Sequence, residues 1–153
     1  MEHLATLGDD AKSHHNQGLA HYKAGEPERA LPEFAHAAKL APRDPFYWNS
    51  LCWYGCLAGH ILDALNAGER AVKLGAGDAN MRDSRGLARA LNGDYKGAIE
   101  DFSFFVNWSK RYGLFEQQGS KRETWIAELR AGRNPFGEVT LKELLKESLE
   151  GKA

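Results

Sequence analysis

Small side chains recur in this sequence at intervals of 34 residues, and this period constrains the fold more than any other feature. The spacing holds in four columns between residues 18 and 98, with Tyr54 as the one large member. A fixed period of this length is typical of a chain that stacks one small structural unit several times. The columns are Gly18, Cys52 and Gly86; Ala20, Tyr54 and Ala88; Gly25, Gly59 and Gly93; and Ala30, Ala64 and Ala98.

Each unit is predicted to form two antiparallel helices joined at the glycine of the third column. A helix commonly ends at a residue with positive φ, a conformation that glycine adopts without steric cost. Small residues in the first and last columns allow the two helices to approach closely, and large residues such as Phe34 and Phe102 are expected to fill the space between them. The pattern therefore predicts an all-α stack of helical hairpins.

Three tandem units resemble the tetratricopeptide repeat, whose pattern is W-x2-L-G-x2-Y, then A-x3-F, then P. The resemblance implies a solenoid of three helical hairpins with C-terminal capping helices. Several positions depart from the pattern, including Arg82 at the first aromatic position of the third unit and Gly68 at the phenylalanine of the second. The matching positions are Gly18, Ala30, Phe34 and Pro42 in residues 11–44; Trp48, Leu51 and Ala64 in residues 45–78; and Gly86, Ala98 and Phe102 in residues 79–108.

The ends of the chain lie outside the repeats. Residues 1–10 are expected to form an N-terminal extension, and residues 109–153 a linker followed by two helices. The spacing of Trp125, Ile126 and Leu129 predicts the first of these helices. Because the last unit of a solenoid needs a cover, both helices are expected to act as caps.

The second capping helix is predicted to begin at Thr140. Glu143 follows three residues later, which is the spacing of a capping box in which the two side chains satisfy free backbone N–H groups. The break before this helix is the turn-forming segment at residues 134–137, Asn-Pro-Phe-Gly.

Composition and charge argue against several classes of function. The net charge of −1 lacks the strongly basic balance of a nucleic-acid-binding domain. Residues 109–134 carry six basic and three acidic side chains, Arg122 among them, and we interpret this patch as a solvated helix face. There is no secretory signal and no apolar run long enough to span a membrane. We therefore expect a cytoplasmic protein with neither a nucleic-acid nor a membrane partner.

Motifs for catalysis are absent from the sequence. It contains no phosphate-binding loop, no H-E-x2-H zinc motif and no nucleophile elbow, so we expect neither an enzyme nor a cofactor. Cys52, Cys56 and His60 are spaced to face one side of a helix, but structural zinc takes four ligands and no second pair is evident. We therefore predict that the two cysteines are reduced core residues and that no metal is bound.

The resemblance also predicts where a partner protein or peptide would bind. In the tetratricopeptide family the first helix of each repeat lines a concave groove, which is expected to be mostly apolar in this chain. Its function would be noncatalytic binding of a peptide or helix of a partner. The implied partner-binding residues are His15, Leu19 and Tyr22 from the first unit; Phe46, Asn49, Trp53 and Leu57 from the second; and Asp83, Leu87 and Leu91 from the third.

One known mode of binding in the family is disfavoured. Chaperone-binding members hold the terminal carboxylate of a peptide with lysine, arginine and asparagine side chains. The corresponding positions here cannot make that set of charge-assisted hydrogen bonds, because none carries a lysine or an arginine. They are occupied by His15, Leu19, Ser50, Asn80 and Ser84.

The sequence leaves the occupant of the groove open. Tyr22, Phe46 and Trp53 would suit an amphipathic helix of a partner as anchors. The chain's own helix around Trp125 is an equally good occupant, and a partner that displaces this tail is a third possibility.

Three segments resemble the C-terminal tetratricopeptide region of bacterial multidomain proteins that carry WD repeats, caspase-like peptidase domains or signalling NTPase modules. This resemblance implies an alternative function, an accessory sensing or positioning domain whose partners are other domains of its own larger chain. The segments are residues 51–55 (LCWYG), 82–91 (RDSRGLARAL) and 125–136 (WIAELRAGRNPF).

Overall fold

The computed structural model describes the backbone of residues 2–151 and the side chains of residues 6–151. Met1 of the expected extension and residues 152–153 of the expected C-terminal region lie outside the described residues. Within the described part the chain is helical throughout, with no strand. The elements are α1 (Glu2–Lys23), α2 (Pro27–Leu40), α3 (Pro45–Leu57), α4 (Ile61–Leu74), α5 (Ala79–Leu91), α6 (Tyr95–Arg111), the short π-helix η1 (Phe115–Gly119), α7 (Ser120–Arg130) and α8 (Glu138–Leu149).

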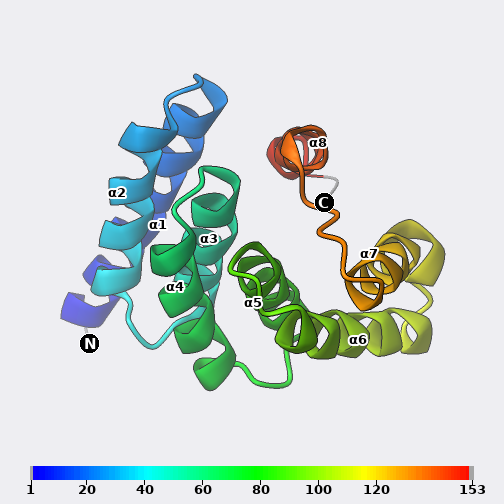
Figure 1. Ribbon diagram of the computed structural model, residues 1–153. Coiled ribbons are helices and arrows are strands. Elements are labelled where there is room, and N and C mark those ends of the chain that lie inside the picture. Colours follow the sequence, from blue (N-terminus) through cyan, green and yellow to red (C-terminus); the bar gives the residue numbers. More distant parts are fainter. Residues whose placement is uncertain (1, 152–153) are drawn as a thin grey trace.

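The first six helices form three antiparallel hairpins, α1–α2, α3–α4 and α5–α6, which confirms the predicted helical-hairpin solenoid. The hairpins stack side by side into a curved array (Figure 1). α7 packs on α6 at the C-terminal end of this array, and α8 lies on its concave side, where it contacts α3. The concave side is therefore bounded by the repeats and by the C-terminal helices.

The glycines of the third column end the first helix of each hairpin, as predicted. Gly25, Gly59 and Gly93 have φ of 77°, 84° and 86°. At each of them two backbone bonds close the helix end; at Gly93, the glycine N–H donates to the carbonyl of Ala90 and the next N–H donates to that of Arg89. This paired pattern is the Schellman motif, which uses carbonyls that the helix itself leaves free.

The first column packs against a second position of each unit, and the sizes of the two residues are complementary. Gly18 lies against the ring of Phe34, and Gly86 lies against Phe102 in the same way. In the middle unit the sizes are reversed, because Cys52 replaces the small residue and its sulfur lies against Gly68. The volume between the two helices is thus filled in all three units, although the middle unit departs from the family pattern at both positions.

A buried ion cluster joins α5 to α6. Asp101 is fully buried and accepts hydrogen bonds from Arg85 at 2.8 and 2.9 Å and from Arg89 at 3.2 Å. Arg82 lies 3.6 Å away from the same carboxylate. Because a buried carboxylate is costly without partners, these arginines, which recur along one face of α5, are what allows Asp101 to occupy the interface.

Three boundaries differ from those expected. The expected N-terminal extension, where it is described, belongs to α1, which begins at Glu2. α6 continues to Arg111, and the expected linker contains η1. The predicted N-cap at Thr140 is wrong, because α8 begins at Glu138 with an extended Gly137 before it. Directly ahead of this start, the ring of Phe136 is buried and fixes the chain to the core.

α7 covers the end of the solenoid and does not fill the groove. Trp125 is buried against Phe102 of the last repeat, with ring centroids 5.3 Å apart, and against Phe136, at 4.9 Å. Ile126 and Leu129 belong to the same core cluster. The helix around Trp125 is therefore an extension of the array, and its apolar face is used in packing on α6.

Candidate functional site

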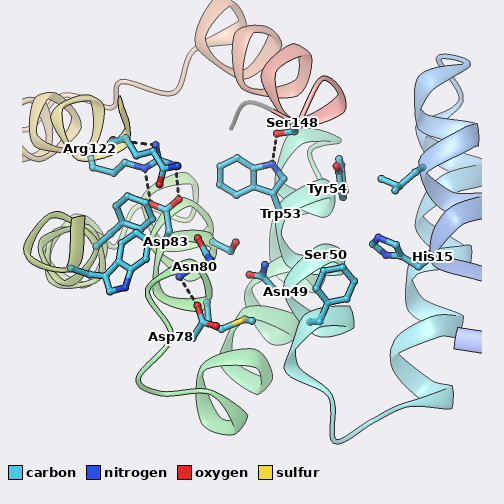
Figure 2. A pocket seen from close by; sticks show the side chains of 18 residues that line it. His15, Asn49, Ser50, Trp53, Tyr54, Asp78, Asn80, Asp83, Arg122 and Ser148 are labelled. Atoms are coloured by element: carbon cyan, nitrogen blue, oxygen red, sulfur yellow. Dashed lines mark hydrogen bonds and ion pairs between the residues drawn. The ribbon is translucent and has the colours of Figure 1, made fainter. Parts of the chain in front are cut away.

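A groove of about 570 Å³ runs along the concave side, and we call it the concave groove. α1, α3 and α5 supply most of its wall, while α6, η1, α7 and the end of α8 close it on the C-terminal side (Figure 2). Its lining residues are His15, Leu19, Phe46, Asn49, Ser50, Trp53, Tyr54, Asp78, Asn80, Met81, Asp83, Ser84, Phe105, Trp108, Gln118, Arg122, Ser148 and Gly151.

The structure brings six of the ten predicted partner-binding residues together in this groove: His15, Leu19, Phe46, Asn49, Trp53 and Asp83. Among them Phe46 is the most accessible apolar side chain, with 48% of its surface exposed. These side chains reach the same space because α1, α3 and α5 are the equivalent first helices of successive hairpins. Their role in binding stays a prediction.

The other four predicted residues do not line the groove. Tyr22 is buried and donates a hydrogen bond to the carbonyl of Tyr54 at 3.2 Å. Leu87 is buried completely, and Leu57 and Leu91 are partly buried against the core. The position of a residue in the repeat predicts which helix carries it. It does not predict whether the side chain lines the groove or packs in the core.

His15 is a buried imidazole on the wall of the groove. It is surrounded by the rings of Phe34, Phe46 and Tyr47, with centroid distances of 5.0 to 5.8 Å. Burial lowers the pKa of His15, so the neutral form is favoured. Its Nδ1 is buried and has no hydrogen-bond partner among the described residues, although the ring projects from α1 toward the groove (Figure 2).

Asn49 on α3 carries a second unpaired polar atom. Its side-chain oxygen is buried and also lacks a hydrogen-bond partner within the described part of the chain. Buried polar atoms are nearly always paired in folded proteins, and an unpaired one costs about 1–3 kcal/mol. Both residues line the concave groove, but these two atoms face the packed side of the groove wall and are closed off from its open space.

The charged part of the groove is an ion pair between α5 and α7. Arg122 donates to both carboxylate oxygens of Asp83, at 3.0 and 2.7 Å, and both residues are buried (Figure 2). The guanidinium carbon also lies 4.5 Å from the ring centroid of Phe105 and 4.9 Å from that of Trp125. Burial alone would lower the pKa of Arg122, but the adjacent Asp83 more than offsets this and raises it.

Arg122 is the exception to the interpretation of residues 109–134 as a solvated basic face, since the other five basic side chains of this segment are exposed or partly exposed. Its side chain is buried, and it is the one cation lining the groove among the residues that the structure describes. Asp78 and Asp83 also line the groove, so charged side chains lie within a lining whose exposed surface is mostly apolar. These charged side chains come from α5, its N-cap and α7, which meet only in the folded chain.

The five positions that correspond to the carboxylate clamp all lie in the groove: His15, Leu19, Ser50, Asn80 and Ser84. The geometry thus retains the place of the clamp while its cations are missing from these positions. Arg122 does not replace them, because its guanidinium is already paired with Asp83.

α8 forms one edge of the groove. Trp53 on α3 donates from its indole N–H to the hydroxyl of Ser148 at 2.8 Å (Figure 2). The same hydroxyl donates to the carbonyl of Leu144, which holds it in place within the helix. Trp53, predicted as a partner anchor, is thus already engaged by a residue of the chain's own C-terminal helix.

The two cysteines lie away from the groove lining. Both are fully buried, and the thiol of Cys52 donates a hydrogen bond to the backbone carbonyl of Ser84 at 3.4 Å. The pKa of the Cys52 thiol is raised mainly by a hydrogen bond with Cys56 and, to a smaller extent, by burial. His60 instead faces α2, where its Nε2 lies 2.9 Å from Glu28, and the described residues contain no group of three metal-ligating side chains.

Several lining residues could not be selected from the repeat pattern. Phe105, Trp108, Arg122 and Ser148 come from the second helix of the third unit and from the C-terminal third of the chain. Trp108 and Arg122 are residue types that are common at binding sites, but their spacing has no relation to the 34-residue period. Only the folding of α7 and α8 onto the array brings them to the groove.

None of the described helices is both long and apolar enough to cross a membrane.

The fold and the first hairpin agree with comparisons to known proteins. Residues 11–44 match the family model of the tetratricopeptide repeat. No curated protein sequence matched the chain. The family match covers the first hairpin, and the likeness of the remaining chain to this family rests on its fold.

Solved tetratricopeptide domains resemble the chain over most of its length. The domain of OM64 from Arabidopsis is 19% identical with a TM-score of 0.69, covering 82% of this chain and 98% of that one. The second domain of human RPAP3, solved with the HSP70 peptide SGPTIEEVD, is 16% identical with a TM-score of 0.66, covering 83% and 98%. The domain of Sgt2 from Aspergillus fumigatus is 21% identical with a TM-score of 0.61, covering 94% and 83%. The chain therefore has the tetratricopeptide fold.

Proposed function

We propose that this chain, a solenoid with a tetratricopeptide repeat at residues 11–44, is a noncatalytic protein-interaction module that binds a peptide or helix of a partner protein in its concave groove. The observation that carries the proposal is the groove of about 570 Å³ on the concave side, where Phe46 and Trp53 lie beside polar side chains such as Asn80. A polypeptide ligand supplies apolar side chains together with hydrogen-bond donors and acceptors, so it matches a lining of this mixed character.

The arrangement of the apolar side chains in the groove supports the same function. Phe46 and Trp53 on α3 line the groove with large aromatic side chains, and Leu19 lines it from the neighbouring α1. Aromatic anchors beside a few fixed polar groups are typical of sites where a small number of residues supply most of the binding free energy. Recognition would then use a preformed curved surface and no covalent step.

The charges of the groove favour a ligand that is not acidic. The peptide bound by the human RPAP3 domain contains two glutamates and ends in aspartate. In this chain Asp78 and Asp83 line the groove, and Arg122 is already paired with Asp83. An acidic peptide would therefore meet carboxylates without a free cation to compensate them, which disfavours it. The fold is shared with that relative, while the recognised chemistry is proposed to differ.

A displayed peptide library selected on the intact chain tests this function. Individual binders are measured by isothermal titration calorimetry against the unchanged chain and two variants, Phe46→Ala and Leu62→Ala. Phe46 lies in the groove, whereas Leu62, which is 70% exposed, lies on α4 outside its lining. We expect Phe46→Ala to weaken binding roughly tenfold or more, since a central aromatic anchor contributes about 2 kcal/mol, and Leu62→Ala to leave it unchanged.

The matched control makes the negative result informative. Both substitutions remove an exposed apolar side chain, so neither should unfold the protein, and far-UV circular dichroism verifies this. Selected peptides that are insensitive to Phe46→Ala but weakened by Leu62→Ala would place binding on the outer face of the repeats. That result would contradict the proposed site.

The resemblance of three segments to larger proteins supports an alternative, in which this module belongs to a longer chain. Residues 51–55, 82–91 and 125–136 resemble the C-terminal tetratricopeptide region of bacterial proteins with WD repeats, caspase-like peptidases or signalling NTPases. On this alternative the module senses or positions within a larger cytoplasmic chain, and its ligand is another segment of that chain. An immunoblot of source cells separates the two arrangements: a band near 17.0 kDa indicates a freestanding module, and a much larger band indicates a host chain.

A further inference from the structure

α8 occupies the edge of the concave groove through one face. Leu145 and Leu149 pack against the buried cluster of Tyr22, Leu31, Phe34 and Tyr54, which belongs to the first two hairpins. Between these leucines, Ser148 accepts the indole N–H of Trp53 at 2.8 Å. One turn of α8 therefore contacts residues of the groove through both apolar and polar groups.

A single ion pair extends this contact toward α7. Glu147, beside Ser148, pairs with Lys121 through both carboxylate oxygens at 2.8 Å. The two side chains remain 39% and 33% exposed, so the pair is open to solvent and contributes about 0–1 kcal/mol. The Lys121–Glu147 pair therefore contributes little to the free energy that keeps α8 on the array.

Few side chains of α8 are buried against the array. Leu144 is the one residue of this helix that is fully buried, and Val139 at its start is 70% exposed. The segment that precedes the helix is held by the buried ring of Phe136, while Arg133, Asn134 and Gly137 around it are exposed. The chain is thus anchored before α8, and the helix itself makes few contacts that a ligand would have to replace.

We propose that α8 occupies the position that a helix of the partner protein takes when it binds to the groove. The partner segment is then an amphipathic helix with two leucines four residues apart, a hydroxyl side chain just before the second leucine and a carboxylate before that. Such a helix would displace α8 and take over its contacts with Trp53 and Lys121. This inference rests on the proposed function and specifies the class of ligand that the groove accepts.

The spacing of the contacts requires a helix. Leu145, Ser148 and Leu149 stand at positions i, i+3 and i+4, a set that shares one face in a helix but not in an extended strand. An extended peptide would direct adjacent side chains to opposite sides and could not repeat this set. A partner helix must compete with the tethered α8. The apparent affinity for the partner helix is therefore its intrinsic affinity multiplied by the fraction of time that α8 leaves the groove free.

The experiment weakens the packing of α8 in the full chain and then adds the sequence of α8 as a separate peptide. In the variant Leu145→Asp with Leu149→Asp, charges replace the two leucines and should release α8. A labelled peptide of residues 138–151 is then titrated and followed by fluorescence anisotropy. We expect the opened variant to bind it at least about tenfold more tightly than the unchanged chain, because the competing helix is gone. The matched control Val139→Asp places a charge on the exposed side of α8 and should behave like the unchanged chain.

Hydrogen exchange decides whether α8 has been released. Loss of amide protection in residues 138–149 of the double variant, with tight binding of the peptide, supports the inference. Loss of protection without a gain in binding overturns it, as does equal binding of a peptide that carries the same two aspartates. A dimer of the opened variant that excludes the peptide also overturns it, because the occupant would then be a second copy of the chain.

A milder variant guards against misfolding. Ser148→Ala removes the hydrogen bond from Trp53 together with the local bond of the hydroxyl to the Leu144 carbonyl, and it leaves both leucines in place. We therefore expect a smaller gain in peptide binding in the same direction; no gain with intact circular dichroism would contradict the inference. These results are separable from those of the proposed function. If library peptides still depend on Phe46 while the α8 peptide never binds, the groove recognises another class of peptide and only the helix proposal fails.

Discussion

Removal of the Asp83 carboxylate should be among the most destabilising single changes on the groove wall. Asp83 and Arg122 each have 6% of their side-chain surface exposed, and their oxygens and nitrogens lie 2.7 and 3.0 Å apart. In the variant Asp83→Ala the guanidinium stays buried between Phe105 and Trp125 without its counter-ion. Breaking a buried pair in this way costs about 3–5 kcal/mol.

The arginine cannot avoid this cost by losing its proton. Asp83 raises the pKa of Arg122 against the lowering effect of burial, and an arginine without that partner is still charged at neutral pH. Relief would require α7 to move and expose the side chain, which also disturbs the packing of Trp125 on Phe102. We therefore expect most of the loss to appear in the free energy of unfolding.

Urea unfolding followed by far-UV circular dichroism measures the effect. Glu147→Gln is the control, since it breaks an ion pair that is partly exposed and should cost no more than about 1 kcal/mol. The double variant Asp83→Leu with Arg122→Met should regain most of the loss, because apolar residues can replace a buried pair at little cost. A loss below about 1 kcal/mol for Asp83→Ala, with an unchanged denaturant slope, would refute the reasoning.

Two further results are expected from the repeats and from the groove. Gly86→Ala should destabilise the chain by about 1–3 kcal/mol in urea unfolding, because the added methyl carbon would lie 2.9 Å from the ring of Phe102; a neutral effect would mean that the ring moves freely. Burial lowers the pKa of His15, so its NMR titration should have a midpoint below 6.5; stability from the neutral ring is then present above pH 6.5 and is lost as the pH falls through the folded-state midpoint. A midpoint at or above 6.5 would contradict its burial.

The period of 34 residues was sufficient to predict the hairpins. Gly25, Gly59 and Gly93 act within one helix end, and Gly18 and Gly86 act on a ring within the same hairpin. These interactions join residues that are close in sequence, so their pattern is visible without the folded chain. Even the departure at Cys52 and Gly68 is readable afterwards as an exchange of volumes between two paired positions.

The candidate site was predicted less completely. The repeat register identified the helices that line the groove, and it selected His15, Asn49 and Trp53 correctly as lining residues. It also selected Tyr22 and Leu87, which are buried. A difference of one position along a helix turns a side chain by about 100°, and the curvature of the stack decides which of these directions faces the groove.

The sequence by itself determined the repeating hairpins, their turns and the helices that face the concave side, because short-range packing and backbone geometry repeat with the chain. Only the tertiary structure decided how the C-terminal third closes the groove. The Asp83–Arg122 pair joins residues 39 apart, and the Trp53–Ser148 hydrogen bond joins residues 95 apart. No period connects such residues; they meet because the turns after α6 and α7 direct α7 onto the last repeat and α8 back across α3.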